Sequence, residues 1–89
     1  MITKQIQVYG LVQGVGFRYF VLQKAKALNI KGFVKNEIDG SVYIEASATD
    51  QIVMDTFIKS IKQGPSLARV KKIFINDLPI KKFTNFQIR

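Results

Sequence analysis

The stretch QIQVYGLVQGVGFRYFVLQKAKAL, residues 5–28, decides the fold. At its start Ile6 and Val8 alternate with glutamines, which is the period-two pattern of a half-buried strand. From Phe17 onward apolar residues recur at helical spacing. Between the two patterns lie three glycines within seven residues. The stretch therefore predicts a strand, a glycine-rich loop and a helix that ends near Asn29.

The segment after this helix predicts a hairpin and a second helix. Strand patterns at residues 31–35 and 41–47 flank the sequence NEIDG, and Asp-Gly is a strong hairpin signal. We expect these two strands to pair antiparallel. The second helix has Thr49 or Asp50 as its N-cap, and Gly64 followed by proline ends it.

The last quarter of the chain predicts further strands. Residues 70–75 form a strand pattern, residues 76–79 (NDLP) indicate a turn, and residues 83–89 indicate a last extended segment. The order is β-α-β-β-α-β plus a short extra C-terminal strand, which is the α+β, ferredoxin-like plan. In that plan two helices cover one face of an antiparallel sheet. Without a linker or repeat, residues 1–89 are expected to form a single domain.

Composition narrows the chemistry that such a domain can perform. Fourteen Lys and Arg against six Asp and Glu give a net charge of +8, which favours an anionic partner. His and Cys are absent, so zinc sites of the usual kind, Cys phosphatases and Ser-His-Asp hydrolases are excluded. No apolar run is long enough for a membrane span and no signal peptide is visible, so we expect a cytoplasmic protein with no membrane contact.

The glycine loop is the first candidate site. Glycines between a strand and a helix let several backbone N–H groups point at one place, with the positive end of the helix behind them, as in sites for tetrahedral anions. Arg18 stands in the first helical turn, where a cation opposes the macrodipole unless an anion lies beside it. The alternative is a tight connection with a solvated arginine. The dinucleotide fingerprint does not fit, because Tyr19 occupies the place of its third glycine, and the P-loop fingerprint does not fit, because no Gly-Lys-Ser/Thr follows.

Two motifs carry a resemblance to a family. Residues 8–18, VYGLVQGVGFR, resemble the first signature of the acylphosphatases, small ferredoxin-like enzymes that hydrolyse the carboxyl-phosphate bond. Residues 32–36, GFVKN, followed by Gly40 and Val42, resemble the second signature at the expected separation. The likeness extends over almost the whole chain. One departure is Ala48, where the family usually has a glycine.

The resemblance implies a function and the residues that perform it. Arg18 and Asn36 correspond to the catalytic pair of the family. The phosphate cradle corresponds to Gln13, Gly14, Val15, Gly16 and Phe17, together with Arg18. The implied reaction is metal-independent, cofactor-free hydrolysis of an acyl phosphate to a carboxylate and inorganic phosphate, with phosphate or sulfate bound as product or inhibitor. We expect a monomer that acts alone and binds no nucleic acid.

Elementary chemistry agrees with this substrate class. The guanidinium of Arg18 can bond two phosphoryl oxygens at once. Asn36 can orient a water molecule but cannot take up its proton at neutral pH. An acyl phosphate releases a carboxylate, whose conjugate acid has a pKa near ~4, so the leaving group departs without a proton donor. The lack of histidine fits this substrate and argues against hydrolysis of alkyl phosphates.

Two other functions suit the same fold and charge. One is an RNA-binding module, suggested by the net charge and by KGFV at residues 31–34, which faintly resembles an RNP1 motif. That motif belongs on the third strand, whereas these residues are expected on the second. The other is an assembly piece of a larger carbamoyl-transfer enzyme, and a free-standing enzyme is preferred because no further domain follows Arg89.

Overall fold

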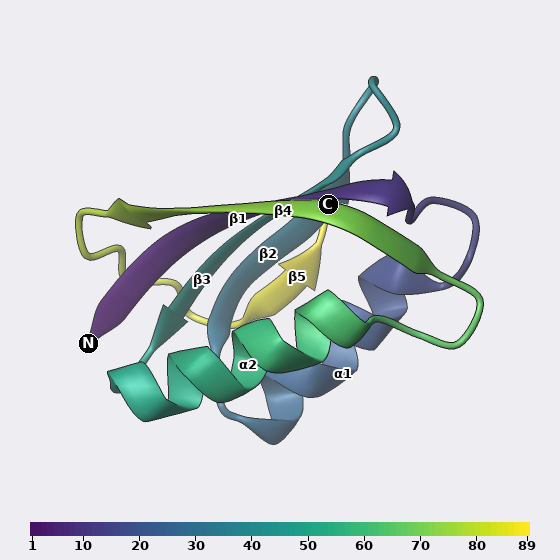
Figure 1. The fold of residues 1–89 in the computed structure, drawn as a ribbon. Coiled ribbons are helices and arrows are strands. Elements are labelled where there is room, and N and C mark those ends of the chain that lie inside the picture. The colour runs from purple at the N-terminus through teal and green to yellow at the C-terminus, as the bar shows by residue number, and fades with distance from the viewer.

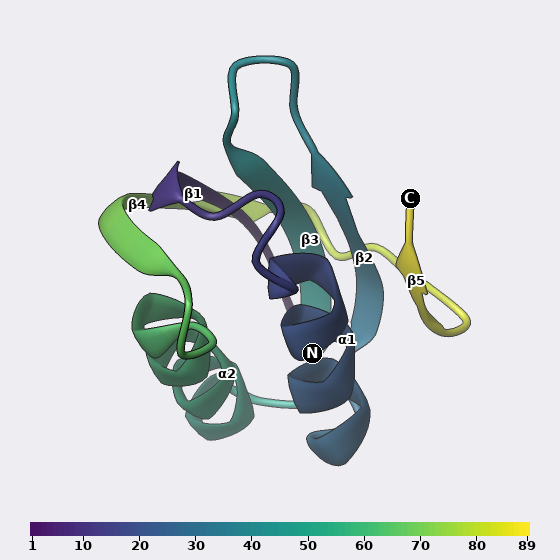
Figure 2. The same cartoon turned by 90° about the vertical axis from the view of Figure 1, so that its right-hand side faces the viewer.

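A computed structural model describes all of residues 1–89. Its elements follow the predicted order, with two helices under one face of a five-stranded sheet (Figures 1 and 2). They are β1 (Ile2–Leu11), α1 (Phe17–Ala27), β2 (Lys31–Asn36), β3 (Val42–Ala48), α2 (Gln51–Gln63), β4 (Arg69–Leu78) and β5 (Phe86–Ile88). Neither helix is long and apolar enough to cross a bilayer.

The sheet has the strand order β4-β1-β3-β2-β5. Its first four strands are antiparallel to their neighbours, as predicted. The short fifth strand runs parallel to β2, with Gly32 opposite Phe86, so the complete sheet is mixed. This arrangement arises because the chain leaves β4 at one edge and returns to the opposite edge before β5 begins (Figure 2).

The prediction of a turn at residues 76–79 is wrong, because most of these residues belong to a strand. β4 continues to Leu78, and Asn76 and Asp77 pair with Gln5 and Lys4 of β1. The physical reason is that β1 is long enough to supply hydrogen-bonding partners for these residues, which outweighs their local preference for a turn. Proline at position 79 ends the strand, because it has no N–H to donate to the ladder.

The last extended segment is also shorter than expected. Only residues 86–88 pair as a strand, whereas residues 79–85 cross the sheet without regular structure. Within this crossing segment the backbone N–H of Lys81 donates to Thr3 Oγ1 at 3.1 Å, and Ser47 Oγ donates to the Lys81 carbonyl at 2.8 Å. These side-chain contacts hold the segment against β1 and β3.

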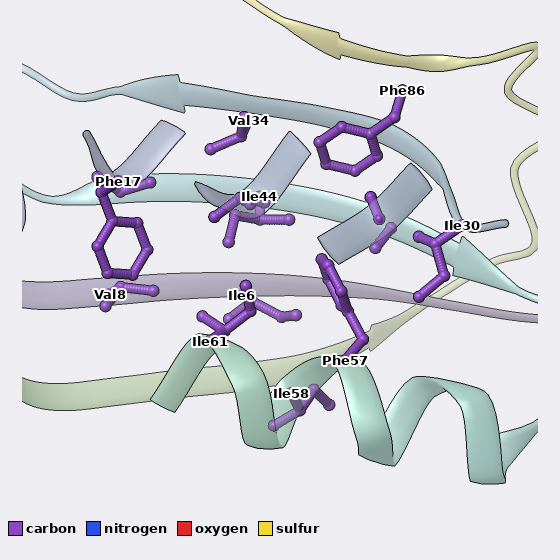
Figure 3. Packing of buried hydrophobic residues seen from close by; sticks show 14 of the residues in the cluster. Ile6, Val8, Phe17, Ile30, Val34, Ile44, Phe57, Ile58, Ile61 and Phe86 are labelled. Atoms are coloured by element: carbon purple, nitrogen blue, oxygen red, sulfur yellow. The ribbon is translucent and has the colours of Figure 1, made fainter. Parts of the chain in front are cut away.

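The core lies between the sheet and the helices (Figure 3). Ile6 and Val8 of β1 are buried, as their alternation with glutamines predicts. The helices contribute their apolar stripes, and the buried residues of this kind are Phe17, Val21 and Ala25 of α1 and Met54, Phe57, Ile58 and Ile61 of α2. Ala48 is buried at the end of β3 in ordinary backbone geometry, since Asn29 is the one non-glycine residue with a positive φ.

The topology brings two loops to one end of the molecule. β3 lies between β1 and β2 and is antiparallel to both, so β1 and β2 run in the same direction. The C-terminal ends of β1 and β2 therefore lie at the same end of the sheet. The glycine loop follows β1 there, and Asn36 is the last residue of β2.

Candidate active site

The glycine loop has the backbone geometry of an anion receptacle. Gly14 and Gly16 have φ values of 75° and 77°, in the left-handed region that side chains disfavour. Gly16 is the N-cap of α1, and no side chain caps this end of the helix. The N–H groups of residues 14–19 donate no hydrogen bond to any other protein group. A set of free N–H groups at a helix N-terminus is available to a negatively charged ligand.

Arg18 lies in the first turn of α1, directly after this loop. Its side chain is exposed and takes part in no ion pair or hydrogen bond within the protein. The guanidinium therefore lies at the positive end of α1 without a counter-ion, which is locally unfavourable. An anion beside the loop would interact favourably with both the guanidinium of Arg18 and the positive end of α1.

Asn36 ends β2 with an unsatisfied polar atom. Its Oδ1 is buried and accepts no hydrogen bond. A buried acceptor without a donor costs roughly 1–3 kcal/mol, and in native structures such an atom calls for an explanation. A donor supplied by a bound ligand or by water would remove this cost.

One cavity of about 230 Å³ brings these groups together. Five of the predicted site residues line it, and they are Gly14, Gly16, Phe17, Arg18 and Asn36. The other two, Gln13 and Val15, do not line it. Three lining residues were missed by the sequence analysis: Val12, Tyr19 and Ile88. Val12 lies within the first motif but has no polar group, Tyr19 follows directly after that motif, and the position of Ile88 depends on where β5 pairs, so the sequence analysis assigned none of them to the site.

The side chain of Gln13 contacts the hairpin instead of lining the cavity. Its side-chain amide donates to the carbonyls of Glu37 at 2.8 Å and Ser41 at 2.9 Å. These carbonyls belong to the β2–β3 connection, so Gln13 fastens the glycine loop to the hairpin that follows Asn36. Val15 is half-buried and packs against the core.

The hairpin connection is itself ordered by a carboxylate. Asp39 accepts hydrogen bonds from the side chain and the backbone N–H of Ser41. These two bonds, the side-chain one first, lower the pKa of Asp39. They hold Ser41 in the position from which its carbonyl accepts the amide of Gln13.

The charge that lines the cavity is positive only. Arg18 is the one charged residue among those that line it. Glu37, the acidic residue that follows Asn36 in the sequence, does not line the cavity, and its carboxylate lies 3.8 Å from Lys35 Nζ. No group of three or more His, Cys, Asp or Glu side chains gathers anywhere in the structure.

Comparison with known proteins identifies the family. The model of the acylphosphatase family matches residues 4–88. An acylphosphatase of Archaeoglobus fulgidus is 43% identical over 88 residues, which cover 99% of this chain and 98% of the relative. The chain belongs to the acylphosphatase family. A second acylphosphatase, from Mannheimia succiniciproducens, is 48% identical over 77 residues, covering 86% and 84% of the two chains.

Solved acylphosphatase structures confirm the ferredoxin-like fold. The crystal structure of an acylphosphatase from Bacillus subtilis superimposes with a TM-score of 0.96 at 34% identity, covering 100% of this chain and 99% of that one. HypF of T. kodakarensis contains a similar unit, with a TM-score of 0.86 and 34% identity, which covers 12% of that longer chain. The family and its hydrolase class are thus established, whereas the roles of Arg18 and Asn36 remain predictions.

The segment that suggested RNA binding has no free aromatic face to offer. Phe33 lies on β2, as expected, and it is only 8% exposed. The guanidinium carbon of Arg89 lies 4.1 Å from the centre of its ring, and Phe83 packs edge-on against it. A base cannot stack on a ring that is already covered in this way.

Proposed function

We propose that this chain hydrolyses acyl phosphates in the cavity between the glycine loop and Asn36. One observation carries the proposal: a single cavity is lined by residues of the glycine loop with free backbone N–H groups, by Arg18 without a protein partner and by Asn36, whose buried amide oxygen accepts no hydrogen bond. The first two suit a phosphoryl group, and the third suits a water molecule. Family membership favours the same reaction.

The phosphoryl group is the part of the substrate that the loop holds. Its oxygens accept hydrogen bonds from the N–H groups of residues 14–19 and from Arg18. The guanidinium can bond two of these oxygens and offset their charge. Because the positive φ values of Gly14 and Gly16 set the direction of the loop N–H groups, little reorganisation is needed when charge spreads over these oxygens in the transition state.

The attacking water is the part of the reaction assigned to Asn36. Its amide oxygen accepts a hydrogen bond from the water and thereby directs a lone pair toward phosphorus, opposite the bond to be broken. An amide takes up no proton at neutral pH, so Asn36 positions the nucleophile without acting as a base. A proton of the water passes to a phosphoryl oxygen.

The leaving group explains why no further acid is needed. As the oxygen of water bonds to phosphorus, the bond between phosphorus and the acyl oxygen breaks, and its electron pair leaves with the carboxylate. A carboxylate is stable at neutral pH, because its conjugate acid has a pKa near ~4. The products are a carboxylate and inorganic phosphate, and neither a metal nor a cofactor enters the scheme.

The test is the hydrolysis of benzoyl phosphate in the presence of a chelator. We expect activity in the parent and a loss on the order of 10²-fold or more in kcat/KM for both Arg18→Ala and Asn36→Ala. Arg18→Lys should recover only part of the loss, since an ammonium group lacks the planar pair of donors.

Two controls accompany these variants. Lys59→Ala removes an exposed cation from α2, and Asn76→Ala removes an exposed amide from β4. Both should leave kcat/KM unchanged. Full activity in Arg18→Ala and Asn36→Ala would refute the assignment of the site, and abolition of the parent activity by the chelator would refute the metal-free scheme.

A further inference from the structure

Two exposed apolar side chains at the cavity have no part in the chemistry above. Tyr19, in the first turn of α1, is 62% exposed, and Ile88, at the end of β5, is 41% exposed. The tyrosine hydroxyl makes no hydrogen bond to the protein. Single exposed apolar residues are common and need no explanation. These two, however, come from opposite ends of the sequence and line the same cavity as Arg18 and Asn36.

The apolar lining of the cavity divides into a floor and a rim. Val12 and Phe17 are almost completely buried, at 1% and 2% exposure, so they form the floor. Tyr19 and Ile88 keep large exposed surfaces, so they form the rim, where the cavity opens to solvent. A substrate held by its phosphoryl group must extend its other end past this rim.

The size of the cavity sets how much of a substrate it encloses. At about 230 Å³ it is smaller than the roughly 300–1,000 Å³ of pockets that enclose drug-sized ligands. It therefore encloses the phosphoryl group and the reacting end of the substrate. The remainder of the acyl group lies against the rim.

The rim offers no partner for a second charge. Arg18 is the one charged lining residue, and its role is to hold the phosphoryl group. Asn36 is assigned to the water. What remains for the acyl group is the ring of Tyr19 and the aliphatic side chain of Ile88, both of which favour apolar atoms.

We propose that Tyr19 and Ile88 form an acyl-binding rim that selects acyl phosphates with an apolar chain or ring over those with a small or charged acyl group. This inference rests on the proposed function and names its substrate class. The rim acts by removing apolar surface of the acyl group from water as the phosphoryl group is bound.

The experiment measures kcat/KM along the series acetyl, butyryl and hexanoyl phosphate. These leaving groups have nearly equal acidity, so differences in rate report contacts with the chain and not reactivity. A fully buried methylene changes an equilibrium about fourfold. For a half-exposed rim we expect about twofold per methylene, and therefore on the order of tenfold from acetyl to hexanoyl phosphate.

The variants Tyr19→Ala and Ile88→Ala should each flatten this dependence on chain length. Tyr19→Phe should preserve it, because the ring and not the hydroxyl makes the contact. Ile52→Ala is the matched control: Ile52 is 78% exposed at the N-terminal end of α2 and does not line the cavity, so its loss should leave the dependence unchanged. Inhibition by inorganic phosphate should persist in all four variants, which shows that the cradle is intact.

The outcomes separate this inference from the function on which it rests. A parent enzyme that hydrolyses all three substrates with equal kcat/KM would overturn the acyl-binding rim while leaving the hydrolysis established. A steep dependence that survives in both Tyr19→Ala and Ile88→Ala would overturn it as well. A parent that hydrolyses none of the three would instead overturn the proposed function.

Discussion

At the scale of single residues, Gln13 connects the two halves of the site. Its amide spans from the glycine loop to the carbonyls of Glu37 and Ser41, so the loop that precedes Arg18 and the hairpin connection that follows Asn36 are joined by one side chain. Catalysis that depends on positioning is sensitive to shifts of about 1 Å. We therefore expect Gln13 to act as a positioning residue, although it does not line the cavity.

Replacing Gln13 by Ala should lower both stability and activity. Two hydrogen bonds of about 1 kcal/mol each are lost, so we expect the free energy of unfolding to fall by roughly 1–2 kcal/mol. The freed loop should lower kcat/KM about tenfold and raise the inhibition constant of phosphate. Urea unfolding and inhibition kinetics measure the two effects. Gln7→Ala, which removes one hydrogen bond to the Ser41 hydroxyl outside the loop, is the control and should spare activity.

A second residue, Glu45, makes stability depend on pH. Burial raises the pKa of its carboxyl group, but hydrogen bonds from Lys81 Nζ at 2.7 Å and from the Tyr43 hydroxyl at 2.7 Å outweigh burial and lower the pKa below the ordinary value of 4.5. Burial, followed by the bond to Glu45, raises the pKa of Tyr43, so the phenol keeps its proton and remains a donor.

The sign of the effect follows from the lowered pKa. The unfolded chain takes up a proton at Glu45 before the folded chain does, so the contribution to stability is present above about pH 4.5 and is lost as the pH falls below it. Glu45→Gln should therefore lower the free energy of unfolding at pH 7 and weaken its decrease between pH 6 and pH 3. Thermal unfolding at several pH values measures this. If Glu45→Gln and Lys81→Met acted additively, the ion pair would not be the cause.

At the scale of elements, the helices follow local rules closely. Of the two predicted N-caps of α2, Thr49 and Asp50, the structure has Asp50, whose carboxylate accepts the backbone N–H of Val53 at 3.0 Å. Gly64 ends α2 with a φ of 68°, as expected for a glycine at this place. Both signals act over a few residues, so the sequence was sufficient to predict them.

Loss of the N-cap of α2 should lower stability without affecting activity. Asp50→Ala should cost about 1 kcal/mol, which for a domain of this size lowers Tm by roughly 4–8 °C. Asp50→Ser should retain most of the stability, because a hydroxyl can cap the same N–H. Activity at 25 °C should be unaffected, since α2 begins at the end of the molecule away from the glycine loop (Figure 1). Calorimetry would contradict this role if Asp50→Ala unfolded like the parent.

The strands depend more on their partners than the helices do. β4 passes through NDLP as far as Leu78 because β1 lies alongside, and Lys4 Nζ pairs with Asp77 at 2.6 Å. A register shift opposite Tyr9 and Gly10 leaves Lys71 without a partner in the ladder. This bulge explains why the apolar residues Val70 and Ile73 are three positions apart in a strand.

At the scale of the whole molecule, the net charge of +8 should assist the capture of an anionic substrate. Salt screens this attraction, with a Debye length of about 10 Å at 0.1 M and about 3 Å at 1 M. We expect kcat/KM for benzoyl phosphate to fall several-fold as NaCl rises toward 1 M, while kcat changes little.

A charge variant provides the control for this effect. The double variant Lys71→Glu and Lys72→Glu reverses two exposed charges on β4 and should give a lower kcat/KM at low salt and a shallower dependence on salt. An identical salt dependence in parent and variant would mean that Arg18 and the loop alone determine capture.

The sequence by itself determined the helices, their caps, the order of elements, and the motifs that contain Arg18, Asn36 and the glycines of the loop. These features depend on periodicity, on backbone freedom and on short motifs, which act over neighbouring residues. Only the tertiary structure decided the length of β4, the parallel edge strand β5, the role of Gln13 as a link and the rim formed by Tyr19 and Ile88. Each of these depends on contacts between residues far apart in the chain, whose free energy exceeds local preference and becomes available only when the sheet has formed.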